Sequence, residues 1–198
     1  MPLLEPDADL DGLHLDSEDL TGQDGRGARL LDCTVTLSTL DDVRLDRAQI
    51  VDTALTGVGA TALTMTEATL RDVTLTDCRL GGVQAYGSEW LRVTVRGGRL
   101  GYLNLRGATL REVRLDGCVV DDLDLAGATV RDLTIADTRV GRLDLTGARC
   151  TDVDLRGLDA LRLERLDGPD GLAGTTIDTG QLAVLAPALA AHLRITVT

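Results

Sequence analysis

The sequence predicts an all-β fold, a quadrilateral β-helix whose coils stack into a rod, and three periodic features carry this prediction. The first is an apolar residue at every fifth position from Leu10 to Leu155, interrupted once at Gly25 and free of insertions or deletions. A spacing of five matches neither the 3.6-residue period of an α-helix nor the two-residue period of a β-strand. It therefore indicates a repeat architecture, in which the every-fifth residue is the centre of each unit.

The second feature is the size of the residue two positions before each centre. The small ones stand twenty residues apart: Ala28, Ala48, Ala68, Ser88, Ala108, Ala128 and Ala148. The large ones are also twenty apart: Val43, Leu63, Val83, Leu103, Leu123 and Leu143. Residues twenty apart must then share an environment, so four units make one coil. At a strand spacing of about 4.8 Å, about eight coils would form a rod roughly 38 Å long.

The third feature is glycine at the second position after the centre, where each unit must turn a corner. It occurs at Gly57, Gly87, Gly97, Gly107, Gly117, Gly127, Gly147 and Gly157. Glycine there supplies the positive φ that a type II turn requires. Two side chains of each unit are thus expected to point inward and three outward.

Five stretches of the chain approximate one pattern, A-(D/N)-L-x-x, each with the central Leu and one of the two preceding residues. They are AT-L-RD (68–72), AT-L-RE (108–112), LD-L-AG (123–127), LD-L-TG (143–147) and VD-L-RG (153–157). The chain in this respect resembles the pentapeptide repeat family, over roughly residues 8–166. The resemblance implies a right-handed quadrilateral β-helix. Many relatives place Phe in the core, whereas this chain has none, and its coils lack the interrupting loops of some gyrase-protecting relatives.

The N-terminal part of the chain is predicted to differ from the repeats that follow. Residues 1–24 are strongly acidic, Glu18 and Gln23 stand at inward positions, and Gly25 breaks the centre series. We expect these 24 residues to form an acidic cap and an imperfect first coil, and residues 25–166 to form the β-helix.

The last part of the chain, residues 167–198, is predicted to form a linker, a short C-terminal α-helical cap and a short strand at Ile195 and Val197. Asp178 or Thr179 is the expected N-cap, and Pro187 should bend the helix or begin a second one. Because a solenoid must cover its ends, we expect this segment to cap the last coil. C-terminal segments dimerise in several relatives, so the resemblance implies a homodimer. Its contact residues would be Leu182, Leu185, Leu189 and Leu193, which recur at helical spacing.

Composition limits the classes of partner. The net charge of −12 disfavours direct nucleic-acid binding and suits a solvated surface or a basic partner. The four cysteines form no CxxC pair, which favours reduced, buried thiols in a cytoplasmic protein. The N-terminus does not resemble a signal peptide, and no stretch is long enough to span a membrane, so we expect no membrane association.

Acidic residues recur at two outward positions. One predicted column holds Asp32, Asp52, Asp72, Glu112, Asp132 and Asp152, with Arg92 between them, and a shorter one holds Asp124, Asp144 and Glu164. Like charges about 4.8 Å apart repel by about 0.9 kcal/mol even in water, so something must offset the repulsion. One interpretation is local: the acids serve the corner turns, and neighbouring arginines neutralise them. The other is that the columns imitate DNA phosphates, as the resemblance to gyrase-modulating relatives implies.

Residues suited to catalysis are sparse. His14 and His192 are the only histidines and stand in the first coil and the tail. Cys78 and Cys118 lie two coils apart, about 9.6 Å by the stacking distance, too far for a disulfide or a shared zinc. We therefore expect no enzyme activity, no metal and no cofactor. Trp90 is interpreted as a core filler, and Tyr86 and Tyr102 as outward contact candidates.

The sequence leaves two functions open. The resemblance implies a non-catalytic interaction protein that modulates or protects DNA gyrase, a type II topoisomerase, through its acidic columns. The alternative is a structural scaffold or interaction module for an unrelated protein partner.

Overall fold

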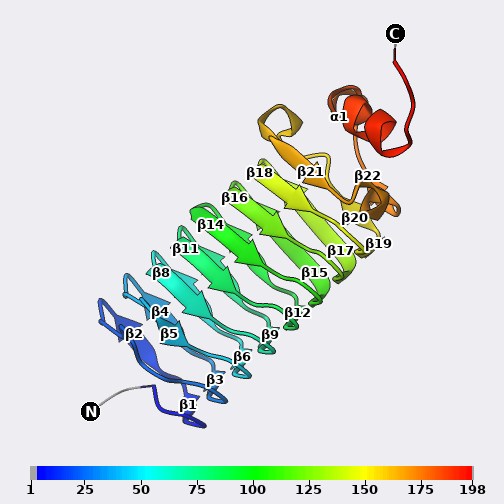
Figure 1. The fold of residues 1–198 in the computed structure, drawn as a ribbon. Coiled ribbons are helices and arrows are strands. Elements are labelled where there is room, and N and C mark those ends of the chain that lie inside the picture. The colour runs from blue at the N-terminus through cyan, green and yellow to red at the C-terminus, as the bar shows by residue number, and fades with distance from the viewer. Residues whose placement is uncertain (1–3, 198) are drawn as a thin grey trace.

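Residues twenty apart in the sequence lie side by side in the structure. The computed structural model describes residues 4–197 and aligns Leu30 with Ile50, Ile50 with Leu70, and Leu110 with Val130. All of these pairs are parallel, and the backbone winds into a rod with the N-terminus at one end and the helical C-terminus at the other (Figure 1). The predicted β-solenoid of about eight coils is confirmed.

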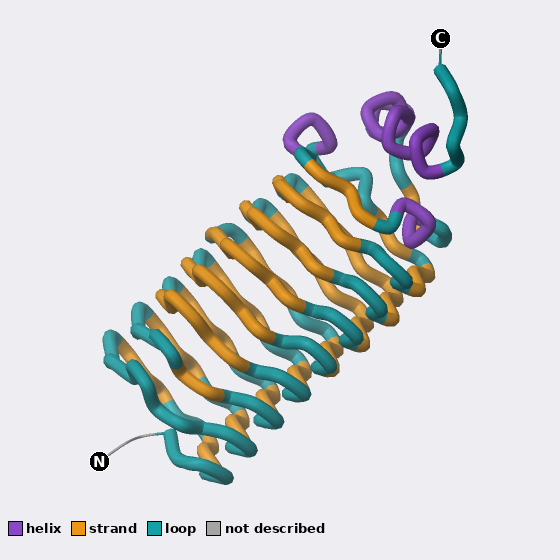
Figure 2. The backbone as a smooth tube through the Cα atoms, in the orientation of Figure 1, coloured by secondary structure: helices purple, strands orange, loops and turns teal. Residues whose placement is uncertain are grey.

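Strands occupy three sides of the coil. The first side stacks β1 (Asp9–Asp11), β3 (Arg29–Leu31), β6 (Gln49–Val51), β9 (Thr69–Arg71), β12 (Glu89–Leu91), β15 (Thr109–Asp116), β17 (Thr129–Ala136) and β19 (Arg149–Thr151). The second stacks β2 (His14–Asp16), β4 (Thr34–Thr36), β7 (Ala54–Thr56), β10 (Thr74–Thr76) and β13 (Thr94–Arg96), then the ends of β15 and β17, β20 (Val153–Asp154) and β22 (Thr175–Thr176). The third stacks β5 (Val43–Arg44), β8 (Gly59–Thr64), β11 (Arg79–Gln84), β14 (Arg99–Asn104), β16 (Val119–Asp124), β18 (Arg139–Asp144) and β21 (Arg165–Asp167). Turns connect these three sides (Figure 2).

The corners use left-handed backbone, but glycine is only one of the residues that supply it. Gly57 and Gly107 both have φ of +63°, whereas Gly157 is outside the positive region. Aspartate is the usual alternative, because nine of the sixteen non-glycine residues with positive φ in residues 4–197 are Asp. Asp tolerates this region better than most residues because its short polar side chain can hydrogen-bond to nearby backbone groups.

One of the four expected corners is straightened along most of the rod. Gly22 and Asp42 turn there with φ of +70° and +56°. From β8 onward the equivalent residues lie inside six-residue strands such as β11 and β14. Two five-residue units therefore merge into one longer side, so the predicted square outline holds only for the first coils.

The interior is filled from the predicted inward positions. Ala28, Ala68 and Ala108 are fully buried, as the small column requires. Trp90, only 4% exposed, is a core residue as expected, and its coil compensates for the large indole with Ala85. Its Nε1–H has no hydrogen-bond partner among the described residues.

The first coil is formed in register, which corrects the expectation of an imperfect coil. β1 and β2 pair with β3 and β4 over all three residues each. The two irregular positions, Gln23 and Gly25, accommodate Leu4 at the start of the rod. Leu4 is buried, and its backbone N–H donates to Gln23 Oε1 at 2.8 Å. A side chain at Gly25 would meet Leu4 Cβ at 3.4 Å and Leu45 Cδ2 at 3.0 Å, so Gly25 leaves the space that Leu4 occupies.

The C-terminal end abandons the twenty-residue period. The 3₁₀ helix η1 (Ala160–Arg162) precedes β21, which pairs with β18 at a spacing of 23 residues. A second 3₁₀ helix, η2 (Pro169–Leu172), leads into β22, which pairs with β20.

The helix α1 (Thr179–His192) follows and packs against η1 and η2. Asp178 is its N-cap, with Gln181 completing a capping box, and the helix continues through Pro187 as one element. Ile195 and Val197 form no strand, which corrects that prediction. The chain closes its last coil with β22 instead.

Candidate interaction surfaces

Six carboxylates follow one corner of the rod. The corner carries Asp32, Asp52, Asp72, Glu112, Asp132 and Asp152, all with φ between +48° and +56°. Their side chains are exposed except Asp72, which is half-buried. We call this set the acidic corner. Because each of these residues also meets the backbone requirement of a turn, local structure is sufficient to explain why acids recur there.

Arginines partly neutralise the acidic corner. Arg92 stands at the corner position between Asp72 and Glu112, and its Nη2 donates to Asp72 Oδ2 at 2.6 Å. This hydrogen bond lowers the pKa of Asp72 and raises the pKa of Arg92. Arg131 lies 3.8 Å from Asp132. Among the described residues, two of the six carboxylates, Asp72 and Asp132, are therefore in ion pairs.

The second predicted column does not form an outward surface. Asp124 is 1% exposed and Asp144 is 6% exposed. Asp124 accepts hydrogen bonds from the backbone N–H of Ala126 at 3.0 Å and from the Tyr102 hydroxyl at 3.2 Å. These two carboxylates are buried in the fold and are not available to a partner. Tyr102 is likewise half-buried and engaged, whereas Tyr86 is 49% exposed.

Glu164 is not a member of that column, because the residues of η1 shift the register. Asp144 pairs with Asp167 instead. Arg142 joins the stack through three carboxylates: its guanidinium nitrogens lie 3.1 Å from Asp122, 3.2 Å from Asp144 and 2.9 Å from Asp167. This ladder raises the pKa of Arg142 and ties the last coils together.

Negative charge is concentrated at the N-terminal end. The first 24 residues contain eight of the 32 acidic residues and none of the 20 basic ones, so they carry two thirds of the net charge of −12. Seven of the eight acids are exposed, and Asp24 is half-buried. Arg26 and Arg44 contact Asp24 at 2.7 Å and 3.0 Å, and the pKa of Asp24 falls to about 2, chiefly through the Arg26 hydrogen bond.

Three features decide the fold: five-residue units, two inward side chains per unit and an in-register repeat of twenty residues. The chain has the pentapeptide-repeat fold. No family model matches the chain, and no curated protein matches it.

Solved structures of similar outline include a trypsin-treated form of QnrB1, a plasmid-mediated fluoroquinolone resistance protein. It is 19% identical with a TM-score of 0.39, and the match covers 96% of this chain and 100% of QnrB1. HetL, a pentapeptide repeat protein involved in heterocyst differentiation regulation from the cyanobacterium Nostoc, is 18% identical. Its TM-score is 0.34, and the match covers 88% of this chain and 91% of HetL. The twenty-residue register of the chain itself defines the fold.

The four leucines predicted for dimerisation do not face one way. Leu185 is 6% exposed and packs toward the solenoid, which makes it a capping residue. Leu182 is 49% exposed, Leu193 is 66% exposed, and Leu189 is half-buried. Gln181, which the spacing argument missed, is buried and donates through Nε2 to the carbonyls of Leu155 and Leu158 at 2.7 and 2.8 Å. The sequence signal for this residue was its place three residues after the N-cap Asp178, where Glu or Gln completes a capping box.

Groups that could perform chemistry are buried or dispersed. All four cysteines are unpaired; Cys33, Cys78 and Cys118 are buried, and burial raises the thiol pKa of Cys78, Cys118 and Cys150. His14 and His192 are exposed at opposite ends. Within residues 4–197 no cluster of His, Cys, Asp or Glu has the arrangement of a metal site. No helix in the same range is long and apolar enough to cross a membrane.

Proposed function

We propose that this chain is a non-catalytic interaction protein that binds a protein partner through the acidic corner. The observation that carries the proposal is the line of exposed carboxylates at Asp32, Asp52, Glu112, Asp132 and Asp152, repeated along one edge of a rod. A regular row of charges on a convex surface suits a complementary basic groove better than a small molecule.

DNA gyrase, or another type II topoisomerase, is the first candidate partner. Support comes from the family resemblance, since some relatives act on gyrase by presenting a DNA-like acidic rod. The spacing of charges on the corner can be compared with the spacing of phosphates on DNA. The corner offers one position per coil, about every 4.8 Å, whereas one DNA strand carries a phosphate about every 3.4 Å. Because Arg92 occupies one of these positions, the proposed mimicry covers short runs of a strand, not a whole duplex.

The test is gyrase supercoiling with purified protein at low and moderate salt. Asn tolerates left-handed backbone, so the triple variant Asp32→Asn, Asp52→Asn, Asp132→Asn removes charge without disturbing the turns. A matched control changes three exposed acids at other corners: Asp42→Asn, Asp77→Asn, Asp137→Asn. We expect salt-sensitive inhibition by the parent and the control, and at least tenfold weaker inhibition by the corner variant. No effect of the parent at micromolar concentration, or equal loss in both variants, would contradict the proposal.

A scaffold for an unrelated partner is the second candidate. The observation that favours it is the charge pattern, because Arg92 and Arg131 neutralise part of the corner while residues 1–24 carry most of the net charge. A partner recovered by affinity capture whose binding is insensitive to salt, and which is not a topoisomerase, would support this candidate.

We also propose that two copies associate through α1 and act in the cytoplasm. Support for the dimer comes from the apolar residues that α1 and its tail leave exposed, Leu182, Val184, Leu193, Ile195 and Val197. Unpaired cysteines support the location. Sedimentation should show a dimer for the parent and for Leu37→Glu, which changes an exposed leucine on the solenoid, and a monomer for Leu182→Glu, Leu193→Glu. A monomeric parent would refute the dimer.

A further inference from the structure

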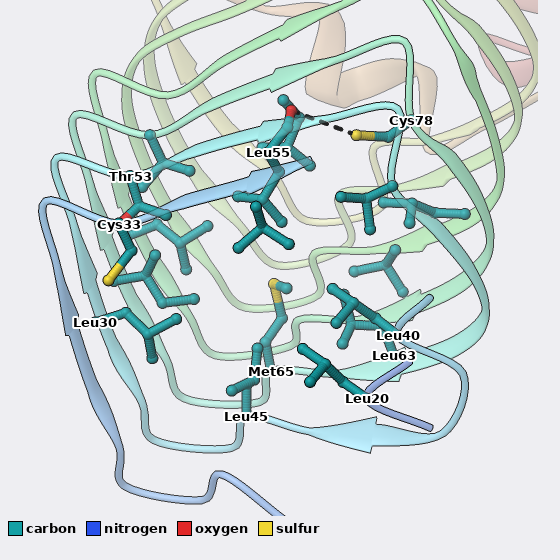
Figure 3. Close-up of a pocket in the computed structure, with 18 of the residues that line it drawn as sticks. Leu20, Leu30, Cys33, Leu40, Leu45, Thr53, Leu55, Leu63, Met65 and Cys78 are labelled. Carbon is teal, nitrogen blue, oxygen red and sulfur yellow. Dashed lines mark hydrogen bonds between the residues drawn. The ribbon is translucent and has the colours of Figure 1, made fainter. Parts of the chain in front are cut away.

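The interior of the first five coils is not completely filled. A cavity of about 50 Å³ lies among inward side chains that run from Leu4 and Leu10 to Leu100 and Leu103. Figure 3 shows the lining residues gathered inside the coils, among them Leu20, Leu40, Leu45 and Met65. We call this cavity the apolar channel.

The hydroxyl and thiol groups that line the apolar channel donate to backbone carbonyls, whereas Trp90, which also lines it, has no partner for its Nε1–H among the described residues. The Thr53 hydroxyl donates to the Val51 carbonyl at 2.9 Å. The Cys33 thiol donates to the Leu31 carbonyl at 3.3 Å, and the Cys78 thiol donates to the Leu55 carbonyl at 3.6 Å (Figure 3). A water molecule needs two to four polar partners to be stable in a buried site. The channel offers hydrocarbon and sulfur surface, so it favours an apolar occupant over water.

Residue size explains why the channel lies in these coils. Several inward positions hold smaller side chains than their equivalents further along the rod. Val35 stands where the next coil has Leu55, Val83 stands where the next coil has Leu103, and Thr53 stands where a later coil has Leu133.

The length and width of the channel limit the size of the molecule that it can hold. It extends over four to five coils, about 20 Å at the stacking distance of parallel strands. Because its volume of about 50 Å³ is spread over this length, it is narrow; by comparison, a dry cavity of about 150 Å³ accepts benzene. We propose that the apolar channel is a binding site for slender apolar molecules, of the width of a xenon atom or a single straight alkyl chain. Planar rings such as benzene are too wide for it.

The chain contains its own reporter for this test. Met65 lines the channel, and its methyl resonance can be followed by NMR, since only Met1 and Met65 are methionines. In the parent protein we expect the Met65 methyl resonance to shift saturably with xenon pressure and to stay unchanged with benzene. No saturable xenon shift would overturn the proposal, and a saturable benzene shift would overturn its size class.

Filled variants locate the binding. Val35 and Val83 line the channel, and in each case the equivalent residues of both neighbouring coils are leucine, so Val35→Leu, Val83→Leu adds volume that the columns already accept. We expect the xenon shift to fall at least twofold in this variant and to persist in Val140→Leu, whose site lies outside the lining. An undiminished shift in a folded Val35→Leu, Val83→Leu protein would overturn the proposal. If that variant does not fold, a xenon-pressurised crystal of the parent decides: density inside the first five coils supports the site, and density only elsewhere refutes it.

Discussion

The first five coils and the last three share one backbone register but differ in how well their interiors are packed. The apolar channel ends at Leu103, beyond which Leu110, Leu123, Leu125 and Ile135 are no more than 2% exposed. Strands also lengthen, from three residues in β3 or β4 to eight in β15 and β17. The comparison shows that a constant twenty-residue register between coils does not fix packing density. In a solenoid each coil contacts only its neighbours, so such differences remain local.

The largest expected effects come from truncating one inward leucine in each region. Leu123→Ala removes a fully packed side chain from the filled coils and should lower the free energy of unfolding by about 4 kcal/mol. Leu63→Ala, in the same column of the hollow coils, should cost about 2 kcal/mol, because its neighbours already lack some contacts. Urea titration of both variants measures the difference. Equal losses would show that the channel does not weaken packing.

Enlarging an inward side chain should destabilise the filled coils and stabilise the hollow ones. Val140→Leu places an extra methylene in a position that is fully buried in the filled coils and should cost about 1–3 kcal/mol. Val83→Leu fills part of the channel and should stabilise the protein by up to about 1 kcal/mol. The same titrations check this pair. Destabilisation of similar size in both variants would contradict the difference in packing.

The ends of the rod allow a smaller test. Gln181→Ala leaves the Leu155 and Leu158 carbonyls without their donor and should cost about 1–3 kcal/mol, with faster amide exchange confined to the last coil. Gln49→Ala changes an exposed glutamine on the solenoid and is the matched control, with no expected effect on that coil. Unchanged exchange in Gln181→Ala would mean that the helix docks without this contact.

The smallest effect concerns acid stability, in which the two regions should behave alike. Asp24 and Asp154 each have a pKa near 2, lowered chiefly by hydrogen bonds from Arg26 and Arg156, against about 3.9 in an unfolded chain. A lowered folded pKa stabilises the protein above about pH 4, and this contribution is lost as the pH falls toward 2. Asp24→Asn and Asp154→Asn should therefore each reduce the fall in Tm between pH 5 and 2, by less than about 4 °C. An unchanged pH profile in either variant would contradict the assigned ion pair.

Periodicity made the solenoid, its inward positions and its Asp178 helix cap predictable from the sequence. The same regularity misled at Glu164, because the three residues of η1 change the spacing and bring Asp167 into the stack in its place. Asp124 and Asp144 were misjudged since an alternating pattern cannot show that a turn folds over a carboxylate and buries it. The apolar channel lay beyond prediction because it depends on the sum of side-chain volumes around each coil, which no single position reveals.

Native-state hydrogen exchange of the parent protein is the most direct test of the difference between the two regions. It compares amides of residues 41–60, which surround the channel, with amides of residues 121–140, which lie in filled coils. Because strands are longer in residues 121–140, the comparison uses amides with matched hydrogen bonds, such as Gln49 to the Ala28 carbonyl and Thr129 to the Ala108 carbonyl, both at 2.9 Å. A difference in protection between such amides reports packing. We predict that amides of residues 41–60 exchange at least ten times faster than those of residues 121–140. Equal protection, or faster exchange in residues 121–140, would contradict the account.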